Sequence, residues 1–513
     1  MKRTAFWYSI LGCLSMIIMM TSCKKSSDYA RVIPADAEVV CRVQAAQLLD
    51  KCGTDNGKFL KEKLLSVINK QATPELSEKL AVIVEDPAKS GLDFKSPVYL
   101  AVGGEVMGTG AMVVARVNDQ DALTELLQTI ATDASEKVMT EDNLTCLSLD
   151  GLLMACDGTT LVMMERAGAG ADAMDKVKSI MNAESEKSIL DDEGFKKMNA
   201  CKGDMQLLGN AGYMEELLKD EMQMLTSVYP SGIDAKDMAG LVDVNFADGE
   251  IALSMEVVAK TDEARQYLES VNQLAGKIGN SYFSRIPEKS LFVMALNVKG
   301  EKFWEQLKAT GSMDVMPDEA KAILEKALTN LDGDVVMAMQ ADPMMLAMNP
   351  GEATVTVYAK VKDGSKVEQM MTDMGMGDLT KNADGIYALP VQQGMVKYLY
   401  LKVDGNDMLM SNKIDMVRNE KVADPVDADM FKGKSVAFVL NVKPITENPA
   451  VEAMAKAAGA RPTVWTLASQ FDRMEIFSKE STKAECHIYL KDKKQNALAF
   501  FVNIGLQLSD EMI

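Results

Sequence analysis

Apolar residues in this chain follow two patterns, short runs typical of β-strands and amphipathic stretches typical of helices. In the first half, strands are predicted at 39–43, 98–102, 111–117, 144–149, 152–156, 160–164, 205–208, 241–245 and 251–258. Helices are predicted from Ala45, across 59–83 with a break at Pro74, across 119–130 behind the N-cap Asp119, from Tyr213, and across 262–274. Asp-Gly and Gly-rich turns between strands predict hairpins.

The second half of the chain repeats this order of elements. Strands are predicted at 291–298, 334–340, 353–361, 386–389, 396–403, 407–410, 436–442, 473–477 and 484–490, and helices at 303–307, 317–328, 365–374 and 495–506. Each half then reads β-α, β-β-α, β-β-β, β-α and β-β-α. The restart is visible at Arg285, where RIPEKSLFVMALNVK parallels RVIPADAEVVCRV from Arg31. An order of elements that occurs twice indicates an internal duplication.

The strands alternate apolar and polar residues, which predicts antiparallel sheets that have one face covered by helices. With 513 residues, the chain exceeds what one hydrophobic core normally serves. The predicted fold is therefore α+β, with two tandem homologous domains at 31–280 and 281–513. KSLFVMALNVK at Lys289 also resembles KSVAFVLNVK at Lys434, so the strand-to-helix unit is expected four times in all.

The first 22 residues have the form of a signal peptide, with a basic start, an apolar run and then Thr-Ser before Cys23. Small residues before this cysteine are typical of a bacterial lipoprotein signal, so Cys23 is predicted to carry the lipid, including palmitate. Residues 23–30 would then form a lipidated tether that holds the protein at a membrane surface. Secretory cleavage with Cys23 as a bystander is the alternative.

Composition excludes some functions. The formal net charge is -20, and the lysines are interspersed with acids, so nucleic-acid binding is not expected. The eight cysteines form no C-x-x-C pair, which excludes zinc ribbons and thioredoxin-type motifs. Cys146 and Cys156 flank a predicted hairpin at Asp150-Gly151 and would pair if they lay opposite each other. The alternative is that both are small buried residues.

The leader, the opening Asp28-Tyr29 and the stretch 32–37 (VIPADA), together with the duplicated body, resemble a family of uncharacterised Bacteroidetes lipoproteins. That family carries a domain of unknown function. The resemblance implies an envelope location and no particular reaction. Surface-exported lipoproteins of this kind are acidic directly after the cysteine, whereas this tether begins Lys24-Lys25. The expected location is therefore the outer membrane facing the periplasm, with surface exposure left open.

Catalytic and metal motifs are weak in this sequence. His487 is the only histidine, which excludes H-E-x-x-H zinc sites, and its neighbour Cys486 should point to the opposite strand face. A structural role for His487 is therefore expected. The Gly-rich stretches from Gly103 and Arg166 lack the residues of a phosphate-binding loop. Trp304, one of three tryptophans, is expected on a buried helix face.

Two further stretches have a chemical and a structural interpretation. The acidic stretch 424–430 would be a weak Ca²⁺ site or a solvated turn, and the turn is favoured because Asp is common in turns. Met370, Met371 and Met374 would offer Cu(I) ligands or form a core-facing helix surface, and 39 methionines in the chain favour the core.

These observations predict a non-enzymatic binding or scaffold protein of the cell envelope, with no cofactor and no metal. Its partner would be the membrane, through Cys23, and a protein or small ligand of unknown identity. One alternative is a lipoprotein that binds a small ligand or peptide in a pocket between the halves. A second alternative is a hydrolase that uses carboxylates alone, because the spacing of acids in space is invisible in a sequence.

Overall fold

The computed structural model describes residues 28–511, except for 105–106, 108–109, 142, 150, 166–172, 183–187, 214–232, 311–312, 314–315, 342–352, 374–380, 392–396, 419, 458 and 460–461. The predicted signal peptide and Cys23 lie outside this range. The chain forms two compact units: unit 1 contains Met1–Leu217, Ala239–Asp248 and Lys494–Ile513, and unit 2 contains Leu218–Met238 and Gly249–Lys493. These units interleave in sequence, whereas 31–280 and 281–513 were predicted as consecutive domains.

Unit 1 is built on an antiparallel sheet with the strand order β4-β5-β6-β7-β3-β2-β1-β8-β9. The strands are β1 (Val39–Val43), β2 (Val98–Val102), β3 (Ala111–Arg116), β4 (Val138–Glu141), β5 (Leu144–Leu149), β6 (Leu152–Cys156), β7 (Thr160–Glu165), β8 (Met205–Asn210) and β9 (Met238–Ala247). Residues of β1 alternate in burial, as a strand with differently covered faces requires.

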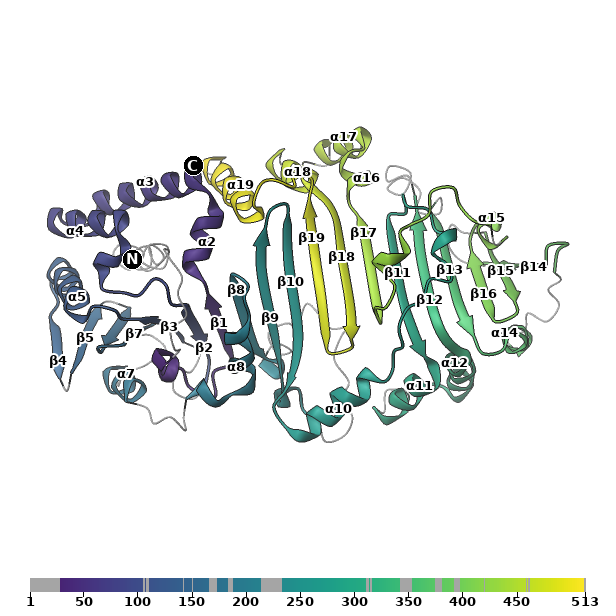
Figure 1. The fold of residues 1–513 in the computed structure, drawn as a ribbon, viewed down its shortest axis with the longest axis horizontal. Coiled ribbons are helices and arrows are strands. Elements are labelled where there is room, and N and C mark those ends of the chain that lie inside the picture. The colour runs from purple at the N-terminus through teal and green to yellow at the C-terminus, as the bar shows by residue number, and fades with distance from the viewer. Residues whose placement is uncertain are drawn as a thin grey trace. The chain divides into compact units, whose positions relative to one another are not determined.

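Unit 1 has seven helices of eight or more residues among its described residues. They are α2 (Ala45–Cys52), α3 (Thr54–Gln71), α4 (Pro74–Glu85), α5 (Gln120–Ala134), α7 (Ala173–Met181), α8 (Glu193–Ala200) and α19 (Ala497–Glu511). Of these, α2, α3 and α19 lie near the ends of β8 and β9. Asp119 caps α5 as predicted, by accepting a hydrogen bond from the Ala122 backbone N–H. Figure 1 shows α19, the yellow C-terminal helix, beside α2 and α3 in purple. A segment from the end of the sequence therefore completes unit 1.

One large core cluster in unit 1 joins α3, α4 and α5 to the sheet. It includes Leu76, Ile83, Leu126, Leu147 and Met163, each at most 3% exposed. The apolar spacing of α5 that predicted one buried helix face is confirmed, because Leu123, Leu126, Leu127 and Ile130 are all buried.

Unit 2 is built on a second antiparallel sheet with the order β14-β15-β16-β13-β12-β11-β17-β18-β19-β10. The strands are β10 (Glu250–Ala259), β11 (Phe292–Lys299), β12 (Leu331–Gln340), β13 (Thr354–Val361), β14 (Ile386–Pro390), β15 (Tyr398–Asp404), β16 (Asp407–Ser411), β17 (Val436–Asn441), β18 (Phe471–Glu480) and β19 (Lys483–Leu490). Its helices are α10 (Asp262–Asn272), α11 (Gly300–Ala309), α12 (Asp318–Asn330), α14 (Gly364–Met371), α15 (Ile414–Val417), α16 (Lys443–Thr446), α17 (Pro449–Ala457) and α18 (Pro462–Ser469).

The two sheets share one strand order. The series β5-β6-β7-β3-β2-β1-β8-β9 in unit 1 corresponds strand for strand to β14-β15-β16-β13-β12-β11-β17-β18 in unit 2. The predicted α+β class with antiparallel sheets is confirmed, and the matching orders support the duplication. Strand β4 and helices α8, α15, α17 and α18 were not predicted, whereas α16 directly follows β17, as the strand-to-helix unit expected there requires. The predicted helix from Tyr213 falls mostly on residues outside the described range.

Gly91 provides a test of local packing in unit 1. Its φ is +82°, and a Cβ there would lie 2.3 Å from the backbone O of Asp119 and 2.6 Å from the backbone N of Leu123. Gly91→Ala should lower the free energy of unfolding by more than about 3 kcal/mol, because left-handed strain adds to a backbone clash. The control Gly405→Ala shares a positive φ, but no atom lies within 4 Å of its Cβ position, so about 1 kcal/mol is expected. Equal losses in urea-unfolding curves would contradict this account.

Candidate functional site

A cavity lies wholly within unit 1, between α2, α3 and α19 and the ends of β8 and β9. Its volume is about 660 Å³, within the range of roughly 300–1,000 Å³ typical of small-molecule sites. Most lining side chains are apolar: Leu48, Leu49, Cys52, Leu60, Leu64, Val84, Pro87, Met205, Phe246, Leu498 and Val502. The remaining lining residues are Asp50, Gly53, Thr54, Gly57, Lys58 and Lys61.

Gly53 sets the angle between the two helices that wall the cavity. It ends α2 and precedes α3 with φ 88° and ψ 153°, a conformation that is essentially restricted to glycine. One turn into α3, the buried Asn56 side chain donates to the backbone O of Cys52 at 2.9 Å and of Ala499 at 3.0 Å. These two bonds join α2, α3 and α19 although α19 lies more than 400 residues away in sequence.

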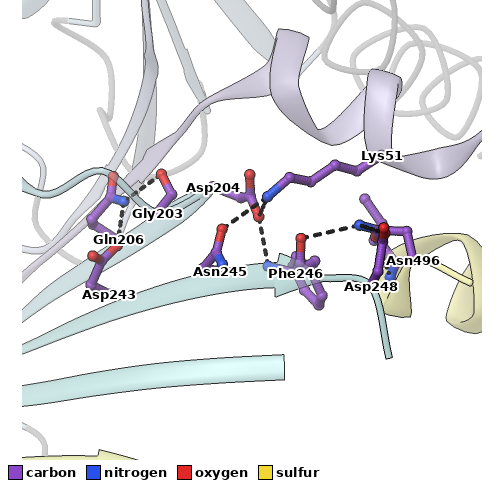
Figure 2. Close-up of polar contacts among 10 residues, drawn as sticks. Lys51, Gly203, Asp204, Gln206, Asp243, Asn245, Phe246, Asp248 and Asn496 are labelled. Atoms are coloured by element: carbon purple, nitrogen blue, oxygen red, sulfur yellow. Dashed lines mark hydrogen bonds and ion pairs between the residues drawn. The ribbon is translucent and has the colours of Figure 1, made fainter. Parts of the chain in front are cut away.

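A polar group braces the cavity at the start of β8. Figure 2 shows Lys51 reaching from α2 to Asp204, and its Nζ lies 2.7 Å from Asp204 Oδ2 and 2.9 Å from Asn245 Oδ1. The same Asp204 oxygen accepts the Phe246 backbone N–H at 2.7 Å. The Asp204 side chain is fully buried, whereas that of Lys51 is 28% exposed. This pair therefore ties α2 to the strand ends that supply Met205 and Phe246 to the cavity.

Two further sets of hydrogen bonds, made by Gln206 and Asn496, lie next to the Lys51–Asp204 pair. Gln206 Nε2 donates to Gly203 O at 2.8 Å and to Asp243 Oδ1 at 2.6 Å (Figure 2). Its Oε1 accepts a hydrogen bond from the buried Arg42. A Cβ at Gly203 would lie 2.1 Å from Asp243 Oδ1, so this close approach requires glycine. Next to α19, Asn496 Nδ2 donates to Phe246 O at 3.2 Å and so links the C-terminal segment to β9.

The Lys51–Asp204 pair has no counterpart at the equivalent positions of unit 2. The backbone N–H of Gln44 donates to Asp204 O, and in the same way that of Asn297 donates to Ser435 O, so Ser435 is equivalent to Asp204. Lys51 lies seven residues after Gln44 in unit 1. The residue seven positions after Asn297 in unit 2 is Trp304, which is 6% exposed. As predicted, this tryptophan lies on a buried helix face. The polar brace is a feature of one copy of the duplicated unit.

His487 is a strand residue of β19, as expected. Its Nδ1 bonds to Glu250 Oε1, and its ring stacks 5.4 Å from Phe477 and 6.1 Å from Tyr489. Cys486 is buried and faces away, because neighbouring strand residues alternate. The structure brings no nucleophile to His487 among these contacts, which agrees with a structural role.

Of the two alternatives for Cys146 and Cys156, the structure agrees with two small buried residues and not with a disulfide. The two strands do form a hairpin, but Cys146 lies opposite Ala155 and Cys156 lies opposite Thr145. This one-residue offset places the two thiols on opposite sheet faces, and both are free. Burial, with a smaller contribution from Asp157, raises the pKa of Cys156 to about 12.

The other candidate stretches have structural roles where they are described. Asp427 in the acidic stretch caps a short helix by accepting the Asp429 backbone N–H. Met371 is buried and Met370 packs against the same core cluster, whereas Met374 lies outside the described residues. Gly103 and Gly104 adopt positive φ after β2, and the loop from Arg166 falls mostly outside the description. No group of three or more metal-ligating side chains is found within the described part of the chain.

Comparison with known proteins identifies the family. Residues 29–498 match a domain of unknown function, DUF4836. The chain belongs to this family. The predicted resemblance to a family with a domain of unknown function is thereby confirmed, while the Bacteroidetes lipoprotein part of it stays a prediction.

Comparisons with curated proteins and with solved structures do not indicate a function. No curated protein matches the chain. It is similar to the solved structures of crystal forms I and III of TP0453, at 14% identity and a TM-score of 0.27 in both cases. These alignments cover 50% of this chain and 89% and 90% of the TP0453 chains. The likeness is too distant to support an argument about function.

Sequence reasoning missed this cavity and its polar brace. The residues come from α2, α3, the β8 and β9 ends and α19, so they are scattered along the sequence. The sequence offered one indication of these elements, the amphipathic patterns of 45–52 and 495–506, which predict two helices. In the first of them, Leu48 and Leu49 precede Lys51. Neither pattern shows that the two helices meet.

The Lys51–Asp204 pair generates a stability prediction. Lys51→Met should lower the free energy of unfolding by about 3 kcal/mol, because it leaves the buried Asp204 carboxylate without its cation. The double variant Lys51→Met/Asp204→Asn should recover all but about 1–2 kcal/mol, because a neutral amide oxygen still accepts the Phe246 N–H. Urea unfolding at neutral pH measures both. A double variant as unstable as Lys51→Met would show that the charge of Asp204 is not the cause.

The thiol of Cys156 generates a reactivity prediction. Because its pKa is raised to about 12, the thiolate is scarce at pH 8 and iodoacetamide should not modify it in the native protein. Peptide mass spectrometry should find Cys156 alkylated only after denaturation. Cys41 and Cys201, which are half-buried, serve as internal controls that should react earlier. A Cys146–Cys156 disulfide in non-reduced native protein would contradict the observed register.

Proposed function

We propose that this protein is a non-enzymatic binding protein of the cell envelope that takes an apolar ligand into the unit 1 cavity. The observation that carries this proposal is a cavity of about 660 Å³ whose lining side chains are mainly apolar. An apolar ligand there would remove further apolar surface from water, which stabilises a complex by about 25 cal/mol per Å².

The lining residues also support a ligand rather than an imperfectly packed core. Leu48, Leu49 and Leu60 are only half-buried, although they line a cavity between well-formed helices. No atom lies within 4 Å of a Cβ at Gly57, so α3 leaves open space on this side. The hydrogen bonds of Asn56 and Lys51 fix the positions of the elements that form the cavity walls, as a preformed binding site requires.

A non-enzymatic role is supported by the chemistry of the lining. Burial raises the pKa of Cys52, which makes its thiol a poor nucleophile. The other polar lining side chains are Asp50, Thr54, Lys58 and Lys61, and none of them is a histidine. Retention of a ligand needs only the apolar walls.

The envelope location rests on the sequence of the leader. A signal-like segment followed by Cys23 supports a lipid anchor in the outer membrane facing the periplasm. Within the described residues, no helix has the length and apolarity that a membrane crossing requires. A lipid anchor would place the cavity near a source of apolar molecules.

Gly57→Leu tests whether the cavity binds ligands. The new side chain would occupy open space in the cavity, and leucine is also the better helix former by about 0.5–1 kcal/mol. Binding of the neutral apolar probe N-phenyl-1-naphthylamine should weaken by at least about tenfold, equivalent to ~1.4 kcal/mol. Fluorescence titration of the purified full chain measures this.

Gly505→Leu is the matched control. Gly505 is also a helical glycine with no atom within 4 Å of its Cβ position, but it is exposed on α19 and does not line the cavity. It should gain the same helix propensity and keep full probe binding. Equal binding by both variants, or no probe binding by the unsubstituted protein, would refute the proposed function.

A further inference from the structure

We propose that the unit 1 cavity selects a single-chain amphiphile whose head is an anion, a carboxylate or a phosphate ester, held by Lys58 and Lys61. This inference rests on the proposed function and adds the chemical class of the ligand. It follows from the placement of charge around an otherwise apolar cavity.

The cavity wall formed by α3 carries two cations. Lys58 and Lys61 are three residues apart, so they lie on the same helix face, and both line the cavity with Gly57, Leu60 and Leu64. The Lys58 side chain is exposed, and no ion pair to it is found among the described residues. Lys61 Nζ lies 3.8 Å from Glu85 Oε2, a long ion pair with an exposed carboxylate. Both ammonium groups can therefore turn to a ligand at little cost.

The backbone adds positive potential at the same place. Gly53 and Thr54 line the cavity at the start of the 18-residue helix α3, where no side chain caps the first backbone N–H groups. A helix N-terminus carries partial positive charge and favours anions. Asp50 is the carboxylate that lines the cavity, and it is exposed to solvent. The charged lining of the cavity therefore consists of two lysines and one solvated carboxylate, and the helix end adds partial positive charge.

Lys51 does not compete for this role. Its ammonium group is already bound to Asp204 and Asn245, both within 2.9 Å. The structural cation and the ligand-binding cations are therefore separate residues on adjacent helices. Substitution of Lys58 or Lys61 should leave the brace of the cavity intact.

The rest of the lining fits one apolar chain. Val84, Met205, Phe246, Leu498 and Val502 come from α4, β8, β9 and α19 and present no charge. A ligand that places one end at α3 and the remainder among these side chains must have a charged head and an apolar tail. This division favours a single-chain amphiphile over a uniformly apolar compound.

Competition with ligands of one chain length tests the proposal. Hexadecanoic acid, monohexadecyl phosphate, hexadecan-1-ol and hexadecylamine would each displace N-phenyl-1-naphthylamine from the purified full chain. The acid and the phosphate should compete about tenfold better than the alcohol, and the amine should compete worst. The relative strength of the acid and phosphate arms distinguishes a carboxylate head from a phosphate head. Higher salt should reduce the preference, because exposed charges are screened.

Substitutions in α3 test whether Lys58 and Lys61 cause the preference for anionic ligands. Lys58→Gln/Lys61→Gln should abolish the preference for the acid and the phosphate over the alcohol. The control Lys63→Gln removes an exposed lysine of α3 that does not line the cavity, and it should retain the preference. If the alcohol competes as well as the acid, or if the double variant keeps the preference, this inference fails and the proposed function stands. If no ligand and no probe binds, both fail.

Discussion

The buried carboxylate of Asp204 is the constraint on which the architecture around the cavity depends. A fully buried carboxylate is costly unless it is paired and hydrogen-bonded, and Asp204 Oδ2 is bound by Lys51 and by the Phe246 backbone N–H. Its second oxygen, Oδ1, is buried without a hydrogen-bond partner among the described residues, so the carboxylate depends on these two contacts. Those partners come from α2 and β9, and Asp204 itself precedes β8. One charge therefore holds together three elements that surround the apolar space. Without it, α2 would have no polar contact of this kind with the strand ends.

Comparison of the two copies shows that the buried ion pair is present in unit 1 alone at the equivalent positions. Both units share the same strand order, and the backbone bonds of Gln44 to Asp204 and of Asn297 to Ser435 are equivalent. At the equivalent of Asp204, unit 2 has a hydroxyl, whose oxygen donates to Lys479 O at 3.0 Å. At the position that corresponds to Lys51, it has Trp304, whose Nε1 donates to Glu325 at 2.9 Å. A large aromatic ring fills space there, whereas unit 1 uses a long, flexible cation and leaves a cavity alongside.

Much of the fold was accessible from the sequence because its signals are local. The strand at 98–102 and the N-cap at Asp119 follow from apolar runs and capping chemistry, and both agree with β2 and α5. Short helices such as the four-residue α15 were missed because they are too short to show a helical period. The sequence left open whether Cys146 and Cys156 pair, because strand register depends on the turn and an offset of one residue reverses the sheet face.

The sequence by itself determined the α+β class, the repeated order of elements and the absence of familiar catalytic motifs, because each depends on residues that are close in the chain. Only the tertiary structure decided that α19 returns to unit 1, that Asn56 bonds to Ala499, and that Lys51 meets Asp204. These contacts join residues more than 150 positions apart. Their formation is governed by the burial of charge and apolar surface in three dimensions, which leaves no periodic trace in the sequence.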